Sequence, residues 1–321
     1  MKYFYFIALT LTTHLALAQQ PSHYSMYMLN HFNWNPAYAG LDNSLSITGV
    51  YRSQWVGLEG SPVTQNVNAH LPLYMLSGGV GINLENDQLG AQHLTKINLS
   101  YNFQRDLGEG ILSLGARAGI VQRSLDGSKI QTPDGDYSEP GVPINHNDDL
   151  LSAEEVSGSV NTFGVGVYYQ SEKLESGISV TNITEPSTDL GTLNLQMVRH
   201  YFFTFGMHFD LSSSLSVHPS VLVRSDLVQT QTDFSTIVRY NDNIFGGASF
   251  RGYNSNSIDA LVLLAGLKLS DNITLAYAYD LTLSGLRTVN SGSHEILLNY
   301  NLNKIIGAGR PPKIIYNPRS L

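Results

Sequence analysis

The side chains that could do chemistry in this chain are ten histidines and scattered carboxylates, without any cysteine. The lack of cysteine excludes disulfide frameworks, thiolate zinc sites, iron–sulfur clusters and cysteine nucleophiles. No H-E-x-x-H spacing is present, and the adjacent His294 and Glu295 would point to opposite faces of a strand. No G-x-S-x-G motif is present either. We therefore expect no enzymatic activity and no metal bound by histidine.

One stretch could bind calcium. Asp134-x-Asp136-x-Ser138 places oxygen ligands at alternate positions, but Glu139 stands where an EF-hand needs glycine. Loop 124–158 as a whole carries one Lys and eight acids, which are Asp126, Asp134, Asp136, Glu139, Asp148, Asp149, Glu154 and Glu155. This composition is typical of a solvated loop. Calcium at loop 124–158 is the weaker alternative, and no other cofactor is expected.

Composition and the N-terminus narrow the class of protein. Only 14% of residues are charged, against about 25% in an average soluble domain, and acids exceed bases by 26 to 18. Nucleic-acid binding is disfavoured because no basic face is available. Lys2, the apolar stretch 3–11 and Ala16-Leu17-Ala18 predict a signal peptide over residues 1–18. No later window is apolar enough for a membrane-spanning helix, so a secreted soluble protein and an outer-membrane barrel remain.

Residue periodicity favours the barrel. Between residues 96 and 104, Ile97, Leu99, Tyr101 and Phe103 alternate with polar side chains, which is the period of a strand with one apolar and one polar face. In many such segments the polar face is rich in Gly, Ala, Ser and Asn, and the apolar face often ends in Tyr or Phe. This pattern is typical of a transmembrane barrel with a polar lumen and aromatic girdles.

We predict a transmembrane antiparallel up-and-down β-barrel over residues 45–303, with about fourteen strands, although 12 or 16 would fit almost as well. Long connections at 124–159, 185–198 and 282–292 alternate with tight turns such as 241–243 and 270–272, so both termini are expected in the periplasm. The predicted strands are 45–55, 62–72, 78–86, 91–104, 111–123, 160–170, 176–184, 199–209, 215–225, 232–240, 244–251, 258–269, 273–281 and 293–303.

The two ends of the chain lack the alternating pattern of barrel strands. Residues 19–44 contain Pro21, Trp34 and Pro36 without alternation, which predicts a periplasmic segment or a plug of the lumen. Residues 304–321, with Pro311, Pro312 and Pro318, predict a periplasmic C-terminal tail.

Charged residues on the lumen face are interpreted as a mutually paired network, because a closed lumen must satisfy its buried polar groups. A selectivity filter is the alternative reading of the same residues. They are Arg52, Glu85, Lys96, Arg117, Arg224, Arg251, Lys268 and Glu295.

Five blocks of sequence resemble one family. They are NPAYAG at 35–40, YRSQWVGLEGSPVTQ at 51–65, AHLPL at 69–73, YAYDLTLSGL at 277–286 and GSHEILLNYNL at 292–302. In this order they resemble the PorP/SprF family, while the middle of the chain matches only in its strand pattern. The final Asn317-Pro318-Arg319 resembles a Cys-Pro-Arg tail of some members, with Asn in place of Cys.

The resemblance implies an outer-membrane component of the type IX secretion system of Bacteroidetes, a system connected with gliding motility. It implies two partners, the C-terminal domain of a secreted adhesin and periplasmic components of the secretion machinery, beside outer-membrane lipid. A porin-like or ligand-specific channel is the alternative function. Candidate partner-binding residues are Trp34, Asn35, Pro36, Tyr38, Gly40, Trp55, Asp134, Asp136, Asp148, Asp149, Leu286 and Arg287.

The predicted barrel has a direct test. The protein should fractionate with the outer membrane, show a β-type circular dichroism spectrum and migrate faster on gels unheated than boiled, because a closed barrel resists detergent until it is heated. A helical spectrum, or recovery from the soluble periplasm, would contradict the fold.

Overall fold

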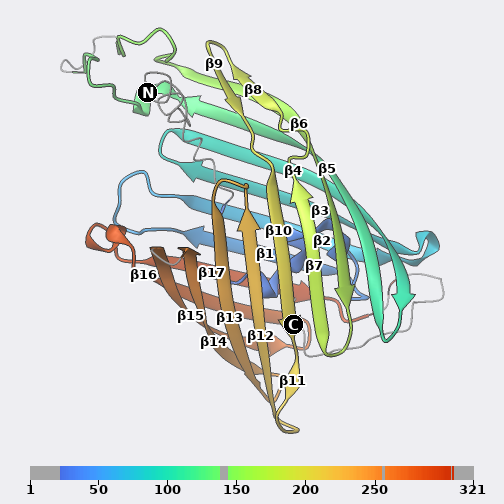
Figure 1. The fold of residues 1–321 in the computed structure, drawn as a ribbon. Helices are drawn as coiled ribbons and strands as arrows, with labels where there is room; N and C mark the ends of the chain where they lie inside the picture. Colours follow the sequence, from blue (N-terminus) through green and yellow to red (C-terminus); the bar gives the residue numbers. More distant parts are fainter. Residues whose placement is uncertain (1–21, 138–143, 255–256, 305, 307–321) are drawn as a thin grey trace, which may run out of the picture.

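The strands close into one antiparallel barrel in the computed structural model, which describes residues 22–137, 144–254, 257–304 and 306 (Figure 1). Within these residues the barrel has fourteen strands, as predicted. They are β1 (Ser46–Ser53), β2 (Val63–Leu73), β3 (Gly78–Leu89), β4 (Gln92–Leu107), β5 (Gly110–Asp126), β6 (Glu155–Gln170), β7 (Leu174–Thr181), β10 (His200–Met207), β12 (Leu215–Ser225), β13 (Thr230–Tyr240), β14 (Ile244–Asn254), β15 (Ser257–Ser270), β16 (Ile273–Thr282) and β17 (Ser293–Asn301).

Neighbouring strands in sequence are neighbours in the sheet, and β1 pairs with β17 to complete the ring. Each predicted strand coincides with one observed strand, and the largest difference is at β6, which begins at Glu155 instead of residue 160. Periodicity did not predict the hairpin of β8 (Ser187–Leu190) and β9 (Leu193–Gln196), which forms a separate sheet inside the connection between β7 and β10. The two-residue β11 (Phe209–Asp210) pairs with β12.

The connections give the barrel two different ends. One end, called here the turn end, is formed by six connections: residues 74–77, 108–109, 171–173, 208–214, 241–243 and 271–272. The other end, called the loop end, contains the described residues of six connections: 54–62, 90–91, 127–137 with 144–154, 182–199, 226–229 and 283–292. The described part of the chain has short 3-10 turns at both: η3 (Tyr74–Leu76) at the turn end, and η4 (Gly127–Lys129) and η5 (Gly285–Thr288) at the loop end.

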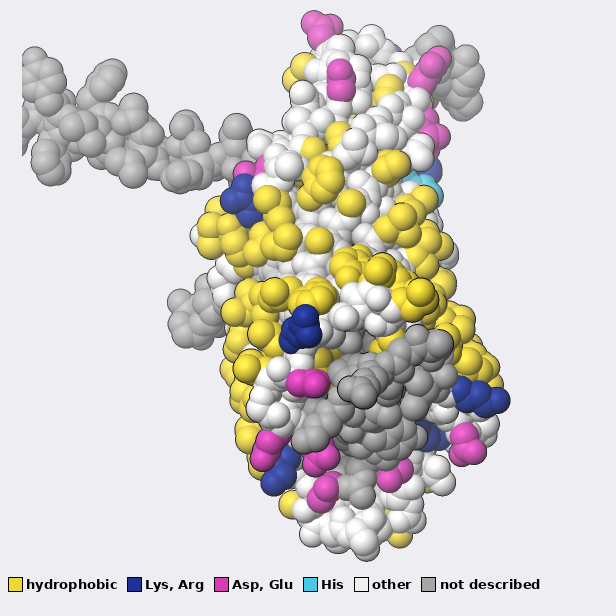
Figure 2. All heavy atoms as spheres, turned by 90° about the vertical axis from the view of Figure 1, so that its right-hand side faces the viewer, with side chains coloured by type: hydrophobic (Ala, Val, Ile, Leu, Met, Phe, Trp, Pro, Cys, Tyr) yellow, Lys and Arg dark blue, Asp and Glu magenta, His cyan; other side chains and the backbone are white. Residues whose placement is uncertain are grey.

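The outer wall carries an apolar belt (Figure 2). Leu99, Tyr101 and Phe103 of β4 are exposed, whereas Ser100, Asn102 and Gln104 between them are buried. The faces therefore alternate as the sequence predicted, with large apolar side chains outward. In Figure 2 these side chains gather across the middle of the molecule, and most of the charged ones lie above or below them. Such a belt suits contact with lipid.

The chain before β1 lies inside the barrel, where we call residues 22–44 the plug segment (blue in Figure 1). It folds into three short helices, η1 (Tyr27–Leu29), α2 (His31–Trp34) and η2 (Pro36–Tyr38). From Tyr24 to Leu41 every residue except Asn33 is buried. No helix in the described part of the chain is long and apolar enough to cross a membrane. The expected signal peptide and nearly all of the expected tail lie outside the described residues.

The lipid-facing assignment can be tested on β5. Leu114 is 51% exposed within the belt, and Gln122 lies on the same face beyond it. In lipid vesicles, Leu114→Arg should lower the free energy of unfolding by about 2–4 kcal/mol, because a charge near the bilayer centre loses its hydration. Gln122→Arg should cost about 1 kcal/mol or less. Equal losses in urea titrations would show that the belt is misplaced.

Candidate functional site

The plug segment binds one half of the lumen through apolar contacts. Its side chains pack against one or two inward apolar residues on each of β1, β10 and β12 to β17. The ring of Trp34, for example, lies with its centroid 5.4 Å from that of Phe202 of β10. The plug residues of this cluster are Tyr24, Met26, Tyr27, Met28, Leu29 and Trp34, and the wall residues are Val50, Phe202, Leu222, Ile237, Phe245, Val262, Leu264, Ala276, Ala278 and Leu297.

The other half of the lumen binds the backbone of the plug. Asn102 of β4 donates from Nδ2 to the carbonyls of Ala37 and Ala39, each at 2.7 Å. Ser113 of β5 donates to the Ala37 carbonyl at 2.6 Å, and Arg117 donates to the Phe32 carbonyl at 2.7 Å. These lumen side chains therefore supply donors to plug carbonyls, in addition to the turn hydrogen bonds that the plug forms within itself.

Close approach explains two of the lumen glycines. A Cβ on Gly79 would lie 2.1 Å from the Ala39 carbonyl oxygen, and one on Gly115 would lie 2.4 Å from the Ala37 nitrogen. Both distances are too short for any side chain. Glycine at these positions lets the plug backbone lie directly on the wall.

Asn35 and Pro36 shape the middle of the plug. The Asn35 side chain accepts a hydrogen bond from the Ala37 nitrogen, which caps η2, and Pro36 takes the first helical position, where its missing N–H costs nothing. Asn35 Nδ2 also donates to the Val167 and Ile178 carbonyls, at 2.9 and 3.2 Å. The same residue thus begins η2 and attaches it to β6 and β7.

Buried ion pairs join strands on one side of the lumen, near the loop end. Arg52 pairs with Asp280 at 2.7 Å and with Glu295 at 3.2 Å. Arg251 pairs with Asp280 at 3.0 Å and with Asp233 at 2.7 Å. Arg224 pairs with Asp233 at 3.0 Å. Arginines and carboxylates alternate along this chain of contacts, so each buried charge has an opposite neighbour.

The eight charges predicted as one network are divided by the structure. Arg52, Arg224, Arg251 and Glu295 belong to one chain of ion pairs, but they are joined through Asp233 and Asp280, which sequence reasoning left out. Glu85 and Lys96 form a separate pair at 2.7 Å. Arg117 binds backbone carbonyls of the plug, and Lys268 lies near the turn end of β15. The inward parity of Asp280 in the β16 pattern was the signal that could have identified it.

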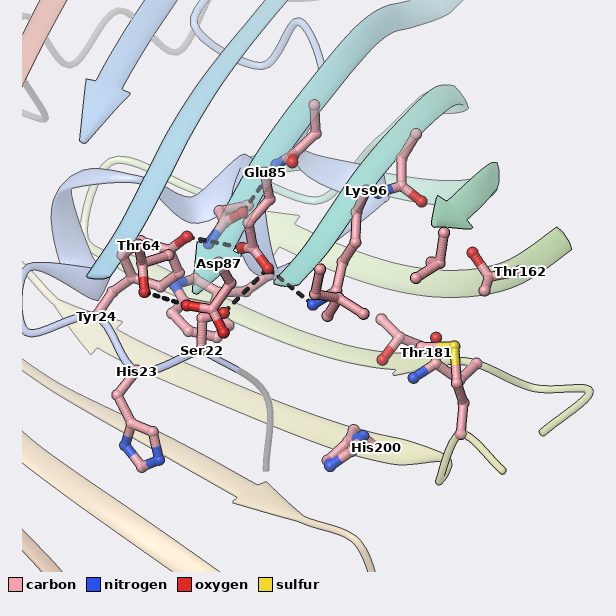
Figure 3. Close-up of a pocket in the computed structure, with 18 of the residues that line it drawn as sticks. Ser22, His23, Tyr24, Thr64, Glu85, Asp87, Lys96, Thr162, Thr181 and His200 are labelled. Carbon is pink, nitrogen blue, oxygen red and sulfur yellow. Dashed lines mark hydrogen bonds and ion pairs between the residues drawn. The ribbon is translucent and has the colours of Figure 1, made fainter. Parts of the chain in front are cut away.

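A cavity of about 360 Å³ remains between the plug and the wall of β2 to β7 (Figure 3). Glu85 lines it and accepts hydrogen bonds from Tyr24 at 2.7 Å and Ser22 at 3.1 Å. Burial, followed by the charge of Glu85, raises the pKa of Tyr24 well above its usual value, so the phenol stays a donor. Burial, followed by Arg224, Arg251 and Arg52, lowers the pKa of His23 well below its usual value. His23 is therefore uncharged at neutral pH.

Two loops join at the loop end into a surface we call the loop-end platform, residues 54–62 and 283–292. The Val56 nitrogen donates to the Gly292 carbonyl at 2.8 Å, and the Ser291 nitrogen donates back to the Val56 carbonyl at 2.7 Å. Trp55 adopts a left-handed backbone, with φ of 51°, and its nitrogen donates to Ser293 Oγ at 3.0 Å. The platform is held by backbone bonds and not by side chains alone.

The candidate partner-binding residues fall into three places. Trp34, Asn35, Pro36, Tyr38 and Gly40 are buried in the lumen, so in this structure they face the barrel wall and form no accessible partner surface. Trp55, Leu286 and Arg287 belong to the loop-end platform, where Arg287 is exposed. The acidic candidates Asp134, Asp136, Asp148 and Asp149 are exposed on loop 127–154.

The proposed calcium ligands are only partly described. Asp136 and Asn145 form an isolated β-bridge, whereas Ser138 and Glu139 lie outside the described residues. In the described ranges, no group of three or more His, Asp or Glu side chains is arranged to hold a metal ion.

Comparisons with known proteins identify one matching family model. The model described as type IX secretion system membrane protein PorP/SprF matches residues 16–300. A search of curated proteins found no match. Among solved structures, the chain is similar to the Ralstonia pickettii toluene transporter TbuX, with 11% identity, 86% of this chain and 92% of that chain covered, and a TM-score of 0.47. It is also similar to the Acinetobacter baumannii outer membrane protein Omp33, with 5% identity, 80% and 96% covered, and a TM-score of 0.46.

Neutralising a carboxylate should cost more stability in a buried ion pair than in an exposed one. Asp233→Asn should lower the free energy of unfolding in vesicles by about 3–5 kcal/mol, because Arg224 and Arg251 would stay buried with one shared carboxylate fewer. Glu185→Gln removes the partner of Arg199 in a pair whose side chains are both more than a third exposed. That loss should be much smaller. Similar losses would contradict the structural importance of the buried pairs.

Proposed function

Because the chain belongs to the PorP/SprF family of type IX secretion system membrane proteins, we propose that this outer-membrane barrel docks a secreted, adhesin-like surface protein instead of conducting solutes. The observation that carries the proposal is the filled lumen, in which the plug is packed on one side and hydrogen-bonded on the other. A channel needs a continuous water path, whereas a docking protein needs a rigid scaffold for its loops.

We place the loop end outside the cell and the turn end in the periplasm. Short turns on one side and longer loops on the other are typical of outer-membrane barrels with this orientation. β1 begins and β17 ends at the turn end, so the residues that follow β17 would meet periplasmic components of the secretion machinery. A signal peptide over 1–18 and a periplasmic tail over 304–321 remain part of this proposal.

The loop-end platform is the surface we propose for the client. It combines apolar side chains with a cation, since Leu283 and Val289 are exposed beside Arg287. Aromatic, aliphatic and arginine side chains on a rigid support are typical of protein-binding surfaces. The paired loops give that support, and the acidic loop 127–154 offers a second contact region at the same end. We propose the C-terminal domain of the exported protein as the occupant.

A porin-like or ligand-specific channel is the competing function, and the cavity beside Glu85 and Lys96 is the observation that favours it. Solute could enter this part of the lumen, but passage would require displacement of the plug. Planar-bilayer conductance separates the two functions. A steady open channel from the intact protein would favour transport, and the absence of conductance would favour docking.

Charge reversal on the platform tests the docking role in cells. Arg287→Glu should lower the amount of client displayed at the surface by about tenfold, because an arginine at a protein interface often contributes strongly to binding. Lys173→Glu, the same change at an exposed position in the turn 171–173, is the matched control and should leave display unchanged. Heat-modifiable mobility of both variants reports barrel assembly. Normal display by assembled Arg287→Glu would contradict docking on the platform and leave loop 127–154 as the candidate.

A further inference from the structure

The plug is bound across the seam where the first and last strands of the barrel meet. β1 and β17 pair over eight residue pairs, from Ser46 opposite Asn301 to Ser53 opposite His294. Within this seam Arg52 lies directly opposite Glu295, and Asp280 lies on the adjacent strand β16. Arg52 and Glu295 are each 1% exposed, so the seam contains buried charge that must be satisfied from inside the barrel.

Two consecutive plug residues satisfy that charge. The Ser25 and Met26 nitrogens donate to the two carboxylate oxygens of Glu295, at 2.7 and 2.9 Å. Ser25 Oγ donates to Asp280 at 2.6 Å and accepts from Arg52 at 2.8 Å. Arg251 of β14 donates to the same hydroxyl at 3.1 Å. Side chains of four strands thus converge on Ser25, which is itself buried.

The apolar contacts repeat this bridging arrangement. Val50 of β1 lies opposite Leu297 of β17, and both belong to the hydrophobic cluster that contains Met26 and Leu29 of the plug. The plug therefore covers two successive inward pairs of the seam, one charged and one apolar.

Two partners of Ser25 lie at very different distances from it along the chain. Ser25 is 27 residues from Arg52 but 270 residues from Glu295. The contact of the plug with β1 is short-range in sequence and forms at a small entropic cost. The contact with β17 forms only after the intervening strands have paired and the barrel closes. When β17 arrives, a plug already lying on β1 presents two N–H groups to Glu295.

We propose that the plug segment is an intramolecular template for barrel closure, which positions the last strand against the first. This role is independent of the docking function, because it concerns how the barrel forms and not what it binds. Ser25 is a positioning residue in it, since it acts by aligning Arg52, Asp280 and Glu295.

A disulfide can report closure of the seam. The chain has no cysteine, so the pair Gly49→Cys and Leu298→Cys, which are opposite each other on β1 and β17, would be the only thiols. A Cβ at Gly49 meets no atom closer than the Leu298 carbonyl oxygen at 4.0 Å, so the substitution fits. The mature reporter chain is refolded from urea into lipid vesicles, oxidised at intervals and separated on non-reducing gels.

The matched variants are Ser25→Ala and Ser179→Ala. Both remove a buried serine hydroxyl from a plug–wall contact, but Ser179 donates to the Trp34 carbonyl from β7, away from the seam. Ser25→Ala should slow disulfide formation about fivefold, as expected for a hydrogen bond already formed in the transition state, while Ser179→Ala should leave the closing rate unchanged. Unchanged closing rates in both variants, with only faster unfolding of Ser25→Ala, would show a purely structural role and overturn the proposal.

Deletion of residues 22–44 gives a second measurement. The deleted reporter should close more slowly than Ser25→Ala, and a synthetic peptide of residues 22–44 added during refolding should raise its closing rate in proportion to peptide concentration. Closing of the deleted chain at the rate of the full chain, or no effect of the peptide, would overturn the template role.

Discussion

A barrel of fourteen strands encloses a lumen wider than its own inward side chains can fill, and the plug segment supplies the missing volume and hydrogen-bond partners. This filling determines much of the lumen chemistry. Inward positions next to the plug are glycine where its backbone touches the wall, and Asn, Ser or Arg where its carbonyls need donors. A lumen of large side chains would leave no room for it.

The two unlike halves of the lumen orient the plug. Its Tyr, Met, Leu and Trp side chains pack on apolar residues of β1, β10 and β12 to β17, because burial of apolar surface is favourable. Its carbonyls at Phe32, Ala37 and Ala39 accept hydrogen bonds from side chains of β4 and β5, since a buried carbonyl needs a donor. The result is a barrel whose lumen is largely occupied by its own N-terminal segment.

Buried charge adds a constraint of a different kind. The chain of ion pairs from Glu295 to Arg224 connects strands β17, β1, β16, β14, β13 and β12, so it ties the seam to the neighbouring wall. Such pairs contribute little net stability compared with apolar contacts, but they are costly to break. Their value here lies in geometry, since only the correct strand arrangement gives each arginine its carboxylate. The same groups hold Ser25, so the fold of the wall and the position of the plug depend on each other.

The sequence by itself determined the positions of the barrel strands and their faces, because the period of two is a local property that each segment displays without its neighbours. The structure decided among 12, 14 and 16 strands. The sequence also identified Arg52, Glu85, Lys96 and Glu295 as inward charges. It could not assign Asp280 to Arg52, locate Asn35 between β6 and β7, or find the β8–β9 hairpin. The tertiary structure decided these points. It also shows residues 22–44 inside the lumen, where the sequence left a periplasmic segment and a lumen plug as alternatives. The physical reason is that the deciding contacts join residues up to 270 positions apart, and only closure of the ring brings their strands together.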